Sequence, residues 1–106
     1  MIERRLISIR RMVPEGRRFE YEAAWRRLHG AVTSTEGAHA WRFRSDEVEG
    51  LFLEFLEFGT DADVRGDMEV LDAIKALHEE FHDPYPIPKT IEEWIETPTL
   101  PPGLSA

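Results

Sequence analysis

The chain contains no cysteine among its 106 residues. This absence excludes a disulfide framework and a thiolate metal site, so any metal would have to be held by imidazole and carboxylate groups. Without a thiol, redox chemistry would need a cofactor or would have to be carried by the substrate itself.

Long apolar runs are also missing. No stretch of the sequence approaches the roughly 20 apolar residues that a membrane-spanning helix needs. Residues 1–5 read Met-Ile-Glu-Arg-Arg, and this start lacks the apolar segment and the small-residue cleavage site of a secretory signal. We therefore expect a cytoplasmic protein with no membrane partner.

Basic charge is scarce relative to acidic charge. The chain has 13 lysines and arginines against 21 aspartates and glutamates, a formal net charge of −8, which repels a phosphate backbone unless arginines form a local stripe. Six arginines do cluster near the N-terminus, namely Arg4, Arg5, Arg10, Arg11, Arg17 and Arg18. Because strand alternation sends the first four to opposite faces in pairs, we expect no nucleic-acid partner.

The length and a composition of 42% hydrophobic and 32% charged residues match one globular domain. We expect a single domain over residues 1–97. A proline-rich C-terminal tail over residues 98–106 would be either disordered or laid across a partner.

Hydrophobic periodicity predicts six elements in this domain. Strands are expected over residues 4–13, 38–45 and 51–58, and residues 90–97 fit either a helical turn or, preferably, an edge strand. Helices are expected over residues 19–33 and, after a capping box at residues 60–63, over residues 64–82. Their apolar stripes consist of Tyr21, Trp25, Leu28 and Val32 in the first and Met68, Leu71, Ile74, Leu77 and Phe81 in the second.

The order strand, helix, strand, strand, helix, strand predicts an α+β fold of the ferredoxin-like, split βαβ type with an antiparallel sheet. Two helices of this length can cover only one face of that sheet. The strand at residues 51–58 is nevertheless apolar on both faces, with Leu51, Leu53 and Phe55 on one and Phe52, Leu56 and Phe58 on the other. The second face thus needs a cover, and we predict a two-fold homodimer joined through the sheet faces.

This element order resembles the dimeric α+β barrel superfamily, particularly its small antibiotic-biosynthesis-monooxygenase-like proteins. The resemblance covers residues 4–97 and includes the segment Gly-Ala-His-Ala-Trp-Arg-Phe-Arg at residues 37–44 and the acidic-aromatic strand that ends in Leu56-Glu57-Phe58. It implies a dimeric α+β barrel. Because members include cofactor-independent oxygenases acting on polycyclic phenols, haem-degrading enzymes, isomerases and decarboxylases, the fold alone transfers no activity.

Haem degradation is disfavoured within this resemblance. The haem-degrading members use an asparagine, a tryptophan and a histidine. This chain has no asparagine at all and no tryptophan between Arg42 and Glu93, so only His78 matches one of the three partners.

Residues 78–82 read His-Glu-Glu-Phe-His and match the metalloprotease pattern His-Glu-x-x-His. His78 and His82 are weak metal candidates, and a third ligand would have to come from Glu92, Glu93 or Glu96. His82 lies at the extreme end of its helix, and a metalloprotease cleft needs a larger fold than this chain can build. We interpret both histidines as structural or surface residues and expect no stoichiometric zinc.

His39, Trp41 and Phe43 share one face of the strand at residues 38–45 and form the better candidate site. A histidine beside two aromatic rings could orient and deprotonate a flat phenolic substrate, whose carbanion then meets O₂. Trp25 and Tyr85 could wall the same pocket. The alternative is that Trp41 and Phe43 are core or dimer-interface aromatics and that His39 is a hydrogen-bonded buried or rim residue.

Two main functions remain open from the sequence, and a metal-binding protein that uses His78 and His82 is a remote third alternative. The first is a monooxygenase-like enzyme that needs no cofactor and acts on a small hydrophobic aromatic substrate. The second is a non-catalytic dimeric ligand-binding or structural protein. A cavity of roughly 300 Å³ or more beside His39 and Trp41 would favour the enzyme, and a filled interior would remove it.

Overall fold

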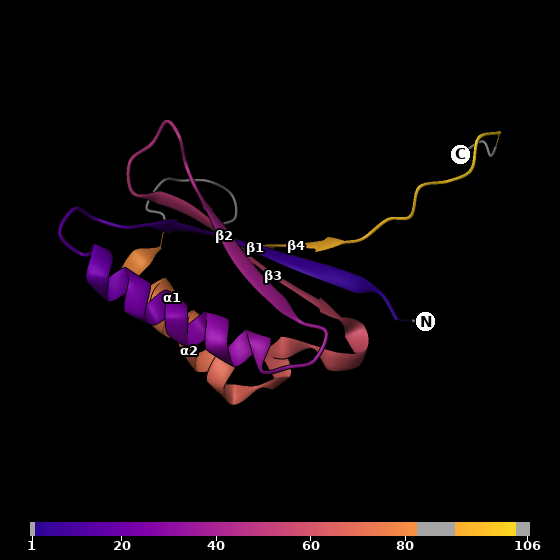
Figure 1. The fold of residues 1–106 in the computed structure, drawn as a ribbon, viewed down its shortest axis with the longest axis horizontal. Coiled ribbons are helices and arrows are strands. Elements are labelled where there is room, and N and C mark those ends of the chain that lie inside the picture. Colours follow the sequence, from indigo (N-terminus) through magenta and orange to yellow (C-terminus); the bar gives the residue numbers. More distant parts are fainter. Residues whose placement is uncertain (1, 83–90, 104–106) are drawn as a thin grey trace.

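The computed structural model of the chain describes residues 2–82 and 91–103 (Figure 1). The strands and helices follow one another in the predicted order, which confirms the ferredoxin-like α+β fold and the edge strand near the C-terminus. The elements are β1 (Arg4–Met12), α1 (Arg18–Thr33), β2 (His39–Arg44), β3 (Leu51–Gly59), the short 3₁₀ turns η1 (Thr60–Ala62) and η2 (Val64–Gly66), α2 (Met68–Phe81) and β4 (Ile91–Ile95).

The four strands form one antiparallel sheet in the order β2-β3-β1-β4. β1 and β3 pair along their whole lengths, with Arg4 opposite Gly59 and Met12 opposite Leu51. β4 is an edge strand that pairs with β1 over five residues. β3 and β1, at the centre of the sheet, are therefore each hydrogen-bonded to two neighbouring strands, whereas β2 and β4 are each hydrogen-bonded to one.

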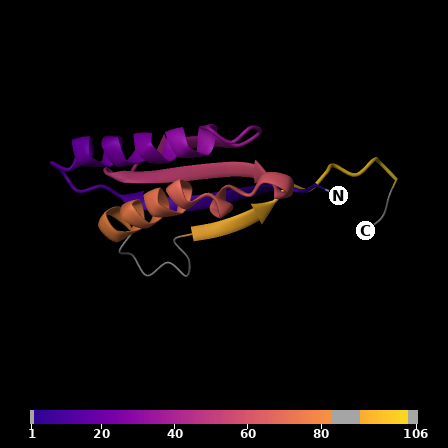
Figure 2. The ribbon, with the colours of Figure 1, turned by 90° about the horizontal axis from the view of Figure 1, so that it is seen from below.

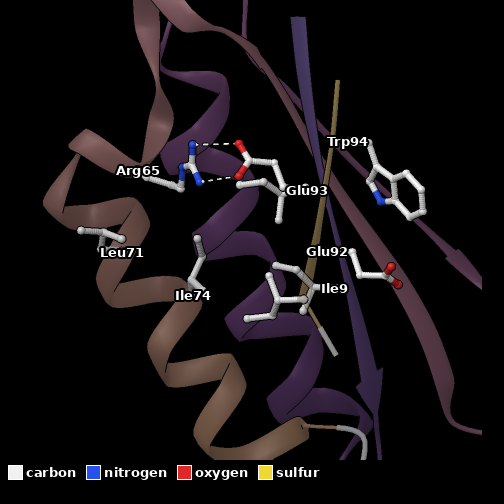
Figure 3. Close-up of a pocket in the computed structure, with 9 residues that line it drawn as sticks. Ile9, Arg65, Leu71, Ile74, Glu92, Glu93 and Trp94 are labelled. Atoms are coloured by element: carbon white, nitrogen blue, oxygen red, sulfur yellow. Dashed lines mark hydrogen bonds and ion pairs between the residues drawn. The ribbon is translucent and has the colours of Figure 1, made fainter. Parts of the chain in front are cut away.

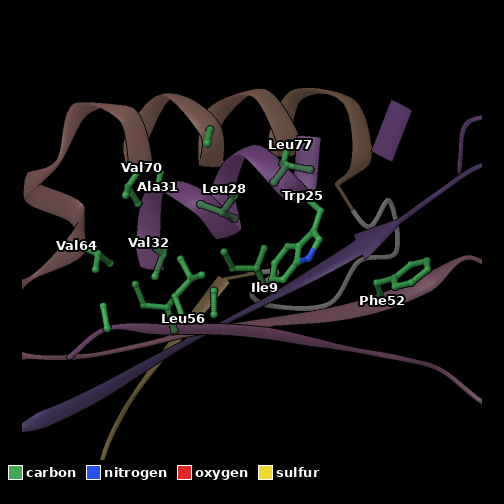
Figure 4. Packing of buried hydrophobic residues seen from close by; sticks show 14 of the residues in the cluster. Ile9, Trp25, Leu28, Ala31, Val32, Phe52, Leu56, Val64, Val70 and Leu77 are labelled. Atoms are coloured by element: carbon green, nitrogen blue, oxygen red, sulfur yellow. The ribbon is translucent and has the colours of Figure 1, made fainter. Parts of the chain in front are cut away.

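Both helices lie side by side on one face of the sheet (Figures 1 and 2). Between them and the sheet lies the hydrophobic core, part of which Figure 4 shows. Its largest fully buried apolar side chains are Tyr21, Phe58, Phe81, Ile9, Leu28, Leu56 and Leu77. Each such side chain contributes roughly 1.5–3 kcal/mol relative to exposure in water, so this one-sided core accounts for the position of both helices.

α2 begins four residues later than the capping pattern at residues 60–63 predicts, because residues 60–66 form the two 3₁₀ turns instead. The true N-cap is Asp67, whose backbone is extended and whose carboxylate accepts a hydrogen bond from the backbone N–H of Glu69 at 2.8 Å. Asp63 caps η2 in the same way by accepting the N–H of Arg65. Asp63 therefore caps a 3₁₀ turn, and Asp67 caps α2.

The buried stripe of α2 also differs from the prediction. Val70, Ala73, Leu77 and Phe81 are buried, whereas Met68, at the first position of the helix, is 66% exposed. Leu71 and Ile74 are only half-buried and lie on the side of α2 that faces the β4 edge (Figure 3).

The face of the sheet away from the helices, termed the open face, carries a second set of apolar side chains. Leu51, Leu53 and Phe55 of β3 are half-buried there, while Phe52, Leu56 and Phe58 on the other parity are more deeply buried. Trp41 and Phe43 of β2 extend the same face and are exposed. The prediction that β3 is apolar on both faces is confirmed, and within the described residues no helix covers the open face.

Beyond β4 the chain continues to residue 103 without a helix or strand, and Figure 1 shows it leading away from the body of the domain. Leu100 in this tail is 59% exposed. Within the described ranges, none of the helices has the length and apolar character that crossing a membrane requires.

Candidate functional site

A cavity of about 480 Å³ lies between α2 and the sheet edge formed by β1 and β4 (Figure 3). This volume falls within the range of roughly 300–1,000 Å³ typical of small-molecule sites. Aliphatic side chains form most of its wall, and the polar groups gather on the η2 and β4 sides. The lining residues are Ile7, Ile9, Arg65, Leu71, Ile74, Ile91, Glu92, Glu93 and Trp94.

The cavity exists because β4 is a short edge strand. The buried stripe of α2 faces α1 and the centre of the sheet, and β4 carries no fully buried side chain. Leu71 and Ile74 therefore face β1 and β4, but their side chains do not fill the space between α2 and these strands. We refer to this space as the helix-side cavity.

Arg65 forms the polar end of the helix-side cavity. Its Nε and Nη2 donate to the two carboxylate oxygens of Asp63 at 3.0 and 2.8 Å. Nη1 and Nη2 donate to the two oxygens of Glu93 on β4 at 3.2 and 3.1 Å. The hydrogen bonds from Arg65 lower the pKa of Asp63 and of Glu93, and the hydrogen bond to Asp63 raises the pKa of Arg65. All three groups are therefore charged at neutral pH.

Glu93 has a second partner on β1. Nη1 of Arg5 donates to Oε1 of Glu93 at 3.3 Å, and Nη2 of Arg5 donates to Glu3 at 2.8 Å. The side chain of Glu93 thus joins β4 to β1 and to η2 at once.

A second hollow, of about 320 Å³, lies on the open face beside Trp41 and Trp94. We refer to it as the open-face groove. Trp94 is fixed by its Nε1, which donates to Oγ of Ser8 at 2.9 Å. The groove is lined by Arg4, Arg5, Leu6, Trp41, Glu57, Trp94, Ile95 and Glu96. Trp94 lines both hollows, so β4 is a thin wall between them.

The structure brings His39, Trp41 and Phe43 to one face, as the alternation predicts. The His39 and Trp41 ring centroids are 6.5 Å apart, and Phe55 of β3 stacks on Trp41 at 6.1 Å and meets Phe43 edge-on at 5.6 Å. His39 is not among the residues that line the open-face groove. Of the three, Trp41 alone borders that groove.

The structure does not bring Trp25 to this group, contrary to the prediction. Trp25 lies on α1, on the helix side of the sheet, and is 8% exposed. Its ring faces the guanidinium of Arg42, 5.1 Å away, and Arg42 has the strand parity opposite to that of Trp41. The sheet therefore separates the two tryptophans. Tyr85 lies outside the described residues.

The motif at residues 78–82 ends α2. His78 and His82 are exposed, their ring centroids are 5.8 Å apart, and Nδ1 of His82 lies 3.2 Å from the carbonyl oxygen of His78. Across residues 2–82 and 91–103, no group of three or more metal-ligating side chains comes together. The described residues thus offer no third ligand to this pair.

The structure contains a buried polar network that the sequence patterns did not predict. Nε of Arg11 donates to Oε1 of Glu54 at 2.9 Å, and both side chains are fully buried. The hydroxyl of Tyr21 donates to Oε2 of the same carboxylate at 2.7 Å. Burial, followed by the charge of Glu54, raises the pKa of Tyr21 far above its ordinary value. The sequence does contain a signal, because Glu54 shares its strand parity with Phe52, Leu56 and Phe58.

Arg42 forms a second polar group beside this network. Its guanidinium carbon lies 5.3 Å from the ring centroid of Tyr21 and 5.6 Å from that of Phe52, and its Nη2 donates to Oε2 of Glu22. Nε of Arg18 donates to Oε1 of the same carboxylate. The hydrogen bond from Arg42 is the main cause of a lowered pKa at Glu22.

No protein-family model matches this chain, and no curated protein matches its sequence. Solved structures do match in fold. SnoaB, a cofactor-independent oxygenase from Streptomyces nogalater, superposes with a TM-score of 0.65 at 16% identity, over 98% of this chain and 100% of SnoaB. A candidate antibiotic biosynthesis monooxygenase from Nitrosomonas europaea gives a TM-score of 0.66 at 13% identity, over 94% of each chain.

A conserved protein of unknown function from Bacteroides thetaiotaomicron, described as a possible oxidoreductase, gives a TM-score of 0.67 at 14% identity, over 89% of this chain and 98% of that one. Identities this low show the fold alone. The resemblance predicted from the sequence is thereby confirmed at the level of fold: the chain shares the fold of these antibiotic-biosynthesis-monooxygenase-like structures.

Proposed function

We propose that the protein is a monooxygenase-like dimeric α+β barrel protein that binds a small hydrophobic aromatic substrate in the helix-side cavity. The observation that carries this proposal is the cavity itself, which has aliphatic walls, a volume of about 480 Å³ and ionisable groups gathered at Arg65 and Glu93. Sites for small organic molecules combine apolar walls with a few placed polar groups in this way. The likeness to a cofactor-independent oxygenase supports the reaction type.

The chemistry we propose is oxidation of a phenol by O₂ without a cofactor. Conversion of a phenol to a para-quinone places one oxygen atom of O₂ on the ring and releases the other as water, and the phenol supplies all four electrons. The protein then has to bind the flat ring, exclude water and help the phenolic proton to leave. In the helix-side cavity the candidate acceptor of this proton is Glu93, the carboxylate that contacts Arg65 (Figure 3). For a substrate held on the open face, the candidate acceptor is His39.

The proposal includes a second copy of the chain. The open face exposes Trp41 and Phe43 beside the half-buried Leu53 and Phe55. Leaving large apolar side chains in water forgoes roughly 1.5–3 kcal/mol each. A two-fold partner packed sheet to sheet would bury this row and complete a barrel.

A non-catalytic ligand-binding protein is the second candidate. The observation that favours it is the lining of the helix-side cavity, which includes no histidine among the described residues. Such a protein would bind the same aromatic molecule and release it unchanged.

Binding of 1-naphthol, followed by calorimetry, tests the site. Ile74→Phe fills the helix-side cavity and should abolish binding, whereas Trp41→Ala, which alters the open-face groove, should leave it within about twofold. The reverse pattern would move the site to the open face. Oxygen uptake with 1-naphthol then separates the two candidates, because the oxygenase consumes O₂ in proportion to protein and the binding protein does not.

A further inference from the structure

Arg65 is positioned by Asp63 and by the ring of Phe58. Asp63 accepts a hydrogen bond from the backbone N–H of Arg65 at 2.9 Å and two from the guanidinium of Arg65 at 3.0 and 2.8 Å. The guanidinium carbon lies 5.3 Å from the ring centroid of Phe58, which is fully buried. Asp63, which also binds the backbone N–H of Arg65, and the buried ring of Phe58 therefore orient this guanidinium.

Arg65 also contacts a carboxylate of the edge strand β4. Glu93 takes two hydrogen bonds from it across the cavity (Figure 3). This contact is partly exposed, with 39% of the Arg65 side chain and 34% of the Glu93 side chain in solvent. Ion pairs of such exposure are weak, so the contact can be exchanged at little cost.

Glu93 would not be left unpaired by such an exchange, because Arg5 also donates to it. All five residues of β4 are exposed, and the strand pairs with β1 alone. A small movement of β4 would therefore release Arg65 while keeping Glu93 beside a cation.

We propose that Arg65 is the specificity-determining residue of the helix-side cavity and selects an aromatic ligand with an acidic oxygen, a phenolate or an enolate, which takes the place of Glu93. The inference rests on the proposed function and names its substrate class. A guanidinium fork binds an anionic oxygen more strongly than it binds a neutral one. The aliphatic walls contact the ring, Arg65 binds the oxygen, and Glu93 accepts the same hydrogen bonds from Arg65 whenever no ligand is bound.

A matched pair of probes tests the inference. 2-Hydroxy-1,4-naphthoquinone is an enolate at neutral pH, and 2-methoxy-1,4-naphthoquinone has nearly the same shape without the charge. The chain has no cysteine to react with either quinone. By calorimetry the hydroxy compound should bind about tenfold more tightly than the methoxy compound, as expected for a charge-assisted hydrogen bond.

Two variants should then act in opposite directions on the hydroxy compound. Arg65→Gln should weaken its binding by about tenfold relative to the control Arg27→Gln, an exposed arginine of α1 outside the cavity. Glu93→Gln, which removes the competing carboxylate, should strengthen it by about threefold relative to the exposed control Glu79→Gln. Binding of the methoxy compound should stay within about twofold in all four variants. Arg65→Lys, which keeps the charge without the fork, should fall between Arg65→Gln and the original chain.

Opposite signs distinguish ligand selection from a structural role, because loss of a structural ion pair would weaken binding in both variants. Equal affinity for the two quinones, or an Arg65→Gln protein that binds the hydroxy compound as its control does, would overturn the role of Arg65 and leave the aromatic site intact. Failure of both quinones to bind any variant would overturn the proposed function together with this inference.

Discussion

Tyr21 donates its hydroxyl hydrogen to Oε2 of Glu54 at 2.7 Å, deep in the core between α1 and β3. Arg11 from β1 holds the other oxygen of the same carboxylate, so three elements meet at one buried charge. Nη1 and Nη2 of Arg11 are buried too and have no hydrogen-bond partner within residues 2–82 and 91–103. A buried charge pair of this kind is costly to break on one side alone.

Arg11→Met should destabilise the protein by about 3–5 kcal/mol, because it leaves Glu54 as an uncompensated buried charge. Tyr21→Phe should cost less, about 1–3 kcal/mol, because it removes one hydrogen bond to that charge. The double variant Arg11→Met, Glu54→Leu should recover most of the loss. Urea denaturation measures all three, and a double variant as unstable as Arg11→Met would contradict this account of the network.

A charge on the open face should disrupt assembly. Phe55→Lys places an ammonium group in the middle of the apolar row that we propose the second copy covers, so it should shift the protein to monomers or unfold it. Phe19→Lys is the matched control, because Phe19 is 91% exposed at the start of α1, away from the open face. Sedimentation equilibrium decides the matter, and a compact, stable monomer of the unsubstituted chain would rule out the sheet-to-sheet dimer.

The pairing of Glu22 with Arg42 should appear in the pH dependence of stability. Arg42 lowers the pKa of Glu22 below its ordinary value of 4.5 in the folded state. The contribution of ionised Glu22 to the free energy of unfolding is therefore fully present above the unfolded-state pKa of Glu22. It is lost as the pH falls through the lower folded-state pKa. The stability difference between the unsubstituted chain and Glu22→Gln should be largest near neutral pH and should shrink below about pH 4.5.

Glu79→Gln is the control for that measurement, since Glu79 is exposed and has no ion pair among the described residues. Its stability difference should change far less between neutral and acidic pH. A Glu22→Gln difference that stays constant down to about pH 3 would show that Arg42 does not stabilise the charged form of Glu22.

Zinc should not bind stoichiometrically to the histidine pair. A structural zinc site needs four ligands, and among residues 2–82 and 91–103 only His78 and His82 come together at the end of α2. Metal analysis of protein purified without a histidine tag measures this directly. One zinc per chain that disappears in His78→Ala would refute it.

The sequence by itself determined the order of the elements and the two-sided character of β3. Both follow from local periodicity, because alternation along a strand and the 3.6-residue period of a helix depend on neighbours in the chain. Phe52, Leu56 and Phe58 are predicted to share a face and do so, as do His39 and Trp41.

Tertiary structure alone decided which of these faces the helices cover and which side chains then become neighbours. Trp25 and Trp41 fall on opposite sides of the sheet because both helices pack on the side of Phe52 and Leu56. Glu54 contacts Arg11, which is 43 residues away in the sequence, and Arg65 contacts Glu93, which is 28 residues away. Strand register sets the first pair and the close approach of η2 to β4 sets the second, and such long-range geometry is not written in local periodicity.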